Sequence, residues 1–207
     1  MSTVSVQRRA RLCVAIVCAA GVAIAAAAPA ADVRISGDWV LDAAASDNFD
    51  TQVNGYIGAS QKKERDRRRR PRMMDDVERI AGSPDDVPLE ATDRTRQRLE
   101  EAFRPAAQLH IELHGDTLAL RGDTMPARNY TLEQTATRMD SNGTATIGAR
   151  WSGGALVIRA KFTNRAVHTQ QLSLDRTGNT LKVLLQVKDP MAVPLQVAST
   201  YRRAPAG

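Results

Sequence analysis

The stretch Ala145-Thr-Ile-Gly-Ala-Arg-Trp-Ser-Gly-Gly-Ala-Leu-Val-Ile-Arg-Ala-Lys-Phe162 decides the fold. On both sides of its central Ser-Gly-Gly, apolar residues alternate with other residues, at Ala145, Ile147, Ala149, Trp151, Leu156, Ile158, Ala160 and Phe162. Alternation with a period of two places these apolar side chains on one face of an extended strand. Because the glycine pair is typical of a tight turn, the stretch predicts an antiparallel hairpin with one apolar face.

The same alternation continues through most of the chain after Pro105. It predicts further strands around residues 109–113, 118–120, 128–132, 167–174, 181–187 and 195–203, and one near the N-terminus at 33–41. Parallel strands need a crossover of about a dozen residues, so the shorter connections here require antiparallel neighbours. Eight or nine such strands can close into a barrel or stack as a sandwich. We predict the barrel, which makes the chain a mainly β protein.

A charged segment separates the first predicted strand from the second. Residues 61–104 are poor in β-branched side chains and are interrupted by Pro71, Pro84 and Pro88. We expect surface helices at 60–70, 73–81 and 92–103, the last with apolar residues at helical spacing. The predicted organisation is a first strand within 32–54, a charged helical insertion over 55–105, and the remainder of the barrel over 106–207.

The first 31 residues have the pattern of an export signal. Three arginines between positions 8 and 11 precede a run of small and apolar residues that ends in Ala-Pro-Ala-Ala. The alternative is a retained membrane anchor, which needs about 20 apolar residues to cross the hydrocarbon core, whereas this run is rich in Ala and Gly. Cys13 and Cys18 lack the Leu and small-residue context of lipid attachment. We predict a signal peptide over 1–31 and a periplasmic or secreted bacterial protein with no transmembrane segment after processing.

The cysteine content and the distribution of charge limit which partners the mature chain can have. Its cysteines leave with the signal, so burial rather than disulfides must hold the domain together. The full chain carries 29 basic and 23 acidic residues, a net charge of +6. Eight of the basic residues crowd into 61–72, and the remainder of the mature chain is slightly acidic. Because basicity belongs to one segment, we expect no nucleic-acid partner.

The predicted strand at 109–113 carries the sharpest candidate for a metal site. His110, Glu112 and His114 project to one face about 6–7 Å apart, and imidazole and carboxylate groups suit zinc or copper. His168, the remaining histidine, could complete the set. The alternative, which we favour, is that these residues form the solvent face of an amphipathic strand.

The basic run is a candidate surface for anionic partners such as lipid headgroups or other components of a cell envelope. Arginine binds phosphate in bidentate fashion, and the run consists of Lys62, Lys63, Arg65, Arg67, Arg68, Arg69, Arg70 and Arg72. The alternative is a solvated charge run, which is the commoner case.

Enzyme signatures are absent from the sequence. It holds no G-x-S-x-G elbow, no H-E-x-x-H, no glycine-rich phosphate loop and no catalytic thiol in the mature chain. We therefore expect neither catalysis nor a cofactor.

Two short motifs near the ends of the mature chain carry a family resemblance. Gly37-Asp38-Trp39 in the first strand and Tyr201-Arg202-Arg203 in the last resemble the signature by which lipocalin-type (calycin) barrels close. The resemblance implies that Trp39 fills one end of the barrel while Arg202 or Arg203 packs across its ring, a cation–π contact worth about 0.5–2 kcal/mol. The strand regions also resemble short secreted lipocalin-like proteins of bacteria, mostly without an assigned activity. The resemblance does not extend over residues 55–105.

Two functions follow from these observations. The first is a non-enzymatic barrel that binds a small apolar or amphipathic ligand, or that serves as an envelope interaction module. A closed sheet of about eight strands has an interior that side chains fill or that holds one small ligand. The second is an envelope-docking protein in which the basic helical insertion binds an anionic surface or a protein partner and the barrel is its scaffold.

Overall fold

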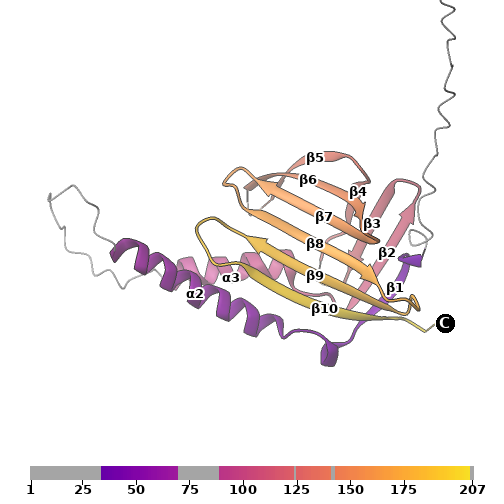
Figure 1. Cartoon of the computed structure of the whole chain (residues 1–207), viewed down its shortest axis with the longest axis horizontal. Helices are drawn as coiled ribbons and strands as arrows, with labels where there is room; N and C mark the ends of the chain where they lie inside the picture. The colour runs from indigo at the N-terminus through magenta and orange to yellow at the C-terminus, as the bar shows by residue number, and fades with distance from the viewer. Residues whose placement is uncertain (1–33, 70–88, 124, 141–142, 206–207) are drawn as a thin grey trace, which may run out of the picture.

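The structure, a computed structural model, describes residues 34–69, 89–123, 125–140 and 143–205 (Figure 1). Ten strands of the described chain form one sheet in the order β4-β3-β2-β1-β10-β9-β8-β7-β6-β5, and neighbouring strands are antiparallel. Their bounds are β1 (Gly37–Leu41), β2 (Gln108–His114), β3 (Thr117–Gly122), β4 (Arg128–Thr131), β5 (Thr135–Asp140), β6 (Gly143–Ser152), β7 (Ala155–Phe162), β8 (Val167–Leu174), β9 (Thr180–Lys188) and β10 (Leu195–Arg203).

The sheet is a nearly closed barrel, because its two edges approach each other where β4 passes into β5. Leu132 forms an isolated bridge with Ala149 of β6, and the backbone N–H of Glu133 donates to the carbonyl of Ala149 at 2.8 Å. Glu133 has a φ of 60°, a left-handed conformation uncommon for a non-glycine residue, and it redirects the chain from one sheet edge to the other. The predicted mainly β barrel is confirmed, with ten strands rather than eight or nine.

The additional strand is β5, which the alternation rule did not predict. Its sequence Thr-Ala-Thr-Arg-Met-Asp has no apolar alternation, and the side chain of Met139 is 79% exposed. An edge strand of this kind is held by its ladder to β6 rather than by a buried face.

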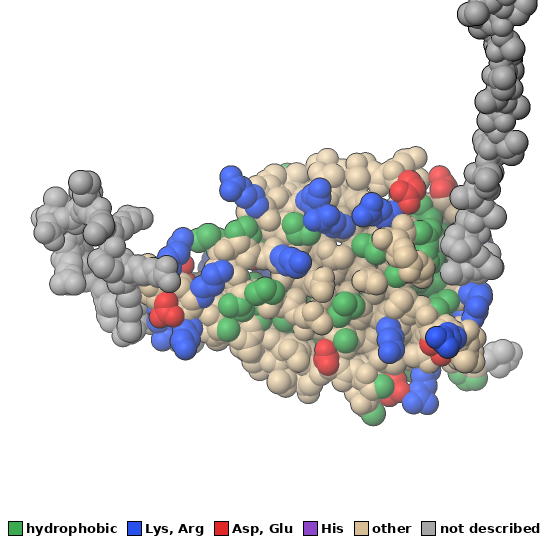
Figure 2. All heavy atoms as spheres, viewed as in Figure 1, with side chains coloured by type: hydrophobic (Ala, Val, Ile, Leu, Met, Phe, Trp, Pro, Cys, Tyr) green, Lys and Arg blue, Asp and Glu red, His purple; other side chains and the backbone are tan. Residues whose placement is uncertain are grey.

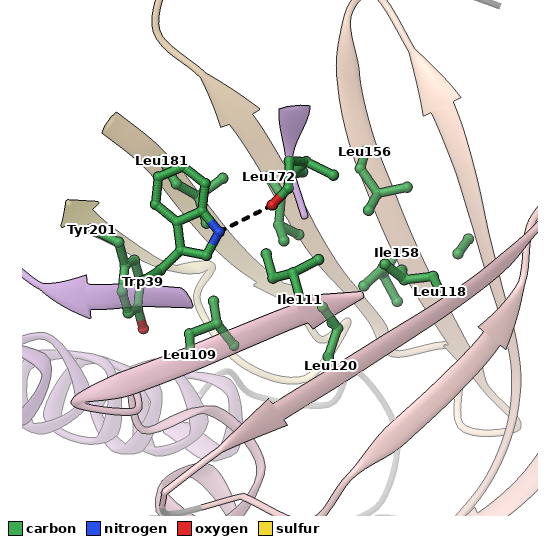
Figure 3. Close-up of a cluster of buried hydrophobic side chains, with 12 residues drawn as sticks. Trp39, Leu109, Ile111, Leu118, Leu120, Leu156, Ile158, Leu172, Leu181 and Tyr201 are labelled. Atoms are coloured by element: carbon green, nitrogen blue, oxygen red, sulfur yellow. Dashed lines mark hydrogen bonds between the residues drawn. The ribbon is translucent and has the colours of Figure 1, made fainter. Parts of the chain in front are cut away.

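Apolar side chains from most of the strands fill the barrel. In the register, Trp39 of β1 lies opposite Leu109 of β2, and Ile111 lies opposite Leu120 of β3. Figure 3 shows Trp39, Tyr201, Leu181, Leu109 and Ile111 pointing into one shared space. The alternation seen in the sequence thus sorts core from solvent on each of these strands.

The helical insertion covers one end of the barrel, as α2 (Phe49–Arg69) and α3 (Leu89–Phe103). The helices pack side by side near β9 and β10 (Figure 1), and a hydrogen bond of 2.7 Å runs from Gln61 Nε2 to Thr92 Oγ1. Val53 and Leu99 join Leu185 and Val197, which face the barrel interior, in one apolar cluster. The insertion between the first and second strands is therefore confirmed, although α2 begins at Phe49; the expected helix at 73–81 lies outside the described residues.

Neither helix in the described part of the chain is both long and apolar enough to cross a membrane.

Candidate functional site

The end of the barrel away from the helices is closed by Trp39 and Arg203. The indole of Trp39 is fully buried, its Nε1 donates to the carbonyl of Ile35 at 3.0 Å, and the Arg203 guanidinium carbon lies 4.4 Å from the ring centroid. Arg203 also donates to the carbonyls of Arg34, Ser36 and Gly178. One cation thus holds the ring, the chain before β1 and the β8–β9 turn together.

The arrangement of the closed end requires glycine at position 37. Its φ is 135°, and a Cβ at this position would lie 2.6 Å from Nη1 of Arg203. Only glycine combines that backbone conformation with room for the guanidinium. The Gly-Asp-Trp motif is therefore part of the closed end.

Arg202 takes no part in the contact with Trp39. It projects from the opposite face of β10 and its guanidinium pairs with Asp42 at 2.7 Å. This hydrogen bond is the main reason that the pKa of Asp42 is below its usual value. Of the two arginines in the motif, Arg203 closes the barrel and Arg202 ties β10 to the segment that follows β1.

The helix-covered end contains a hollow of about 160 Å³, which we call the mouth pocket. Its walls come from both helices, the β7–β8 turn and the end of β9. Apolar surface is provided by Leu99, Phe162, Ala166 and Val187, and polar groups by Tyr56, Thr95, Arg98, Asn164, His168 and Asp189. Burial is the largest cause of the raised pKa of Tyr56, and the charge of Asp189 raises it further. The mouth pocket therefore combines apolar walls with a polar, partly charged rim.

A second hollow, of about 50 Å³, lies deeper in the barrel; we call it the inner hollow. Leu109, Leu172 and Val183 line it together with the polar side chains of Gln170 and Ser199. Tyr201 borders the same space, and burial is the main reason that its pKa is raised to about 12. The barrel interior is thus largely filled, with room for only a few water-sized groups.

Phe103 and His168 stand between the two hollows. Phe103 lines the inner hollow and His168 lines the mouth pocket, and their ring centroids are 4.9 Å apart in an edge-to-face contact. Phe162 contacts the other side of the imidazole, with centroids 4.4 Å apart. The two hollows are therefore neighbours, and the rings of Phe103 and His168 are in contact between them.

Sequence reasoning placed His168 with a metal site and did not connect it with Phe103. The two residues are 65 positions apart and come together only because α3 packs over the barrel end. The register places His168 opposite Val187, on the inner face of the sheet, whereas His110 lies on the outer face. The structure does not bring His168 to the other candidate ligands.

The remaining metal candidates form a carboxylate–histidine cluster on the outer face. His110 Nδ1 lies 2.5 Å from Asp38 Oδ1 and Nε2 lies 2.9 Å from Glu112 Oε1, so both ring nitrogens have partners. The hydrogen bond with Glu112, and after it the one with Asp38, raises the pKa of His110. The same hydrogen bond with His110 lowers the pKa of Glu112. Within the described ranges, no group of three or more residues is arranged to hold a metal ion. The metal site of His110, Glu112 and His114 stays a prediction.

Part of the basic run is used inside the structure. Lys63 Nζ donates to the carbonyls of Ala192 at 2.7 Å and Pro190 at 3.3 Å, fastening α2 to the β9–β10 loop. Arg67 pairs with Glu64 at 2.9 Å, and Nε of Arg65 is buried without a hydrogen-bond partner among the described atoms. Lys62 is exposed. The side chains of Arg68, Arg69, Arg70 and Arg72 lie outside the described residues, and the docking surface stays a prediction.

No protein-family model matches the chain, and no curated protein matches it. Among solved structures, "REP1-NXSQ fatty acid transporter" superposes with a TM-score of 0.46 at 13% identity, covering 84% of this chain and 98% of that one. A secretory abundant heat soluble protein from Ramazzottius varieornatus gives 0.49 at 14% identity, covering 83% and 96%. Apo lipid binding protein 8 from Caenorhabditis elegans gives 0.48 at 12% identity, with the same coverage of 83% and 96%.

Proposed function

We propose that this chain is an exported, non-enzymatic binding barrel that takes a small amphipathic molecule at its helix-covered end. The observation that carries the proposal is the pair of neighbouring hollows, one with a charged rim and one that reaches from the end of α3 into the barrel. A pocket with apolar walls and a few placed polar groups is the usual form of a small-molecule site.

The walls and rim assign the two ends of the ligand. Its polar end lies at the rim, where Arg98 and Asn164 are exposed, and its apolar end lies against Leu99, Phe162 and Val187. The mouth pocket is smaller than the roughly 300–1,000 Å³ of typical ligand sites. A longer ligand therefore requires the half-buried ring of Phe103 to rotate. That rotation would connect the mouth pocket with the inner hollow.

Export is the second part of the proposal and rests on residues 1–31, which lie outside the described residues. The positive and then apolar pattern of this segment supports it. Cell fractionation, with N-terminal sequencing of the accumulated protein, tests it: we expect a mature terminus near residue 32 outside the cytoplasm. Accumulation of the full chain in the cytoplasm would refute it.

Binding is tested with the uncharged fluorophore N-phenyl-1-naphthylamine, which has apolar rings and one polar nitrogen. We expect a saturable rise in its fluorescence with the mature protein. Arg98→Trp, which fills the mouth pocket, should weaken the affinity roughly tenfold. Gln97→Trp is the matched control, because Gln97 is exposed on the same helix, hydrogen-bonded to Glu101, and does not line the pocket.

Phe103→Ala provides the opposite change. Removal of the ring joins the hollows and should strengthen binding of the same probe. Absence of saturable fluorescence in the wild-type protein, or equal weakening by the two tryptophan substitutions, would exclude the mouth pocket as the binding site.

A further inference from the structure

A third hollow lies on the outside of the barrel, away from the proposed ligand site. It is a groove of about 360 Å³ over the outer face of β5, β6 and β7, the largest of the three hollows described for this chain. Figure 2 shows a row of Lys and Arg side chains over the part of the surface where Figure 1 draws β6 and β7. We call this hollow the outer groove.

The floor of the outer groove is Gly148 of β6. A Cβ at this position would lie 3.0 Å from Cγ2 of Thr135 and 3.1 Å from the carbonyl oxygen of Gln134. The φ of Gly148 is not in the left-handed region, so close approach of the 134–135 backbone, rather than backbone conformation, favours glycine here. The absence of a side chain lets the 134–135 segment approach β6 closely and keeps this part of the outer face low.

Three cationic side chains surround that floor. Arg159 of β7 lies directly opposite Gly148, Arg150 follows Gly148 by two residues on the same face, and Lys161 follows Arg159 in the same way. Directly opposed residues have Cβ atoms about 4.5–5.5 Å apart and diagonal neighbours about 7–8 Å. Side chains of this length can therefore approach one another over the β6–β7 side of the glycine.

The positive charge of the outer groove is only partly balanced by the described residues. Arg150, Arg159 and Lys161 are exposed, and the described part of the chain supplies none of them with an ion pair. Glu133 is the one acidic residue among the described residues that line the groove. Three positive charges against one negative charge leave the groove cationic.

Glu133 helps to shape the outer groove. It is one of two described non-glycine residues with a positive φ, and it lies on the rim of the outer groove. This conformation places the 134–135 segment beside Gly148, where it forms one wall of the groove.

We propose that the outer groove binds a small, soluble, multiply charged anion of the phosphate class. The two arginines present planar forks that match two phosphate oxygens each, and Lys161 adds a point charge. Thr135 and Thr146 line the groove and carry hydroxyl groups that can donate to further oxygens. A concave groove favours a molecule that enters it over a flat lipid surface.

Calorimetric titration of the mature protein with inorganic pyrophosphate at low ionic strength tests the proposal. We expect saturable binding that weakens as sodium chloride is added. The double variant Arg150→Gln/Arg159→Gln should lose affinity roughly tenfold or more. The matched control is Arg176→Gln/Lys182→Gln, which removes the same charge from exposed positions at the β8–β9 hairpin outside the groove.

Three outcomes overturn the proposal: no pyrophosphate binding by the wild-type protein, equal weakening in the two double variants, or binding only to vesicles that contain anionic phospholipid. Circular dichroism of each variant verifies that the barrel is intact. The naphthylamine probe is uncharged and enters the helix-covered end of the barrel, so its binding is expected to be unchanged in Arg150→Gln/Arg159→Gln.

Discussion

The two open ends of the barrel are covered in different ways. At the closed end, Trp39 is fully buried, and Arg203 holds the ring and three backbone carbonyls in place. At the other end, two helices cover the opening and leave the mouth pocket beneath them. A single aromatic side chain fills space completely, whereas a helix pair bridges it, so the room for a ligand is at the helical end.

The largest expected effect comes from emptying the closed end. Trp39→Ala removes a buried ring and its hydrogen bond to Ile35, and we expect a loss of about 3–5 kcal/mol in the free energy of unfolding. Phe103→Ala, at the helical end, should cost less because that ring is half-buried beside existing hollows. Urea unfolding of the two variants measures the difference. Equal losses would mean that the two ends are packed equally well.

A smaller effect should separate the two neighbouring arginines of the last strand. Arg203→Ala removes the contact with Trp39 and the donors to three carbonyls, and we expect a loss of about 2–3 kcal/mol. Arg202→Ala removes a pair between Asp42 and an arginine side chain that is 75% exposed, and it should cost less than Arg203→Ala. Thermal unfolding of both variants is the measurement. If Arg202→Ala is as damaging as Arg203→Ala, the closed end does not depend on the guanidinium that lies over the indole.

The smallest expected effect concerns pH and the outer surface beside the closed end. The pKa of His110 is raised in the folded protein by Glu112 and Asp38. Its contribution to stability is therefore fully present below the unfolded pKa, near 6.5, and is lost as the pH rises through the raised folded value. Urea midpoints at several pH values should show a larger wild-type advantage over His110→Gln at pH 5.5 than at pH 9. A constant difference would mean that the pairs of His110 do not form in solution.

The strands could be predicted from the sequence wherever apolar and polar side chains alternate along the chain. The hairpin of β6 and β7 follows from its own pattern, and the insertion follows from its charge and prolines. β5 could not be predicted this way, because the side chains of residues 135–139 are all exposed. The start of α2 had a signal that was not used: the side chain of Asn48 accepts a hydrogen bond from the N–H of Thr51 at 3.0 Å, a helix cap.

The closed end was accessible from the sequence and the mouth pocket was not. Alternation could even have separated the arginines, because Arg203 is in phase with the apolar Leu195, Val197 and Tyr201, whereas Arg202 is not. The contact between Phe103 and His168, in contrast, depends on how α3 packs over the barrel. The outer groove depends on Gly148, whose significance is visible only once Thr135 lies beside it.

The bridge between Leu132 and Ala149 has a further consequence for the architecture. Every other junction around the barrel is a ladder of several residue pairs, but this one is a single bridge with one backbone hydrogen bond beside it. The circumference of the barrel is therefore closed at this junction, which has the fewest backbone contacts, by the short segment between β4 and β5. Residues inserted between Leu132 and Thr135 would widen the cylinder and leave the other nine junctions in register.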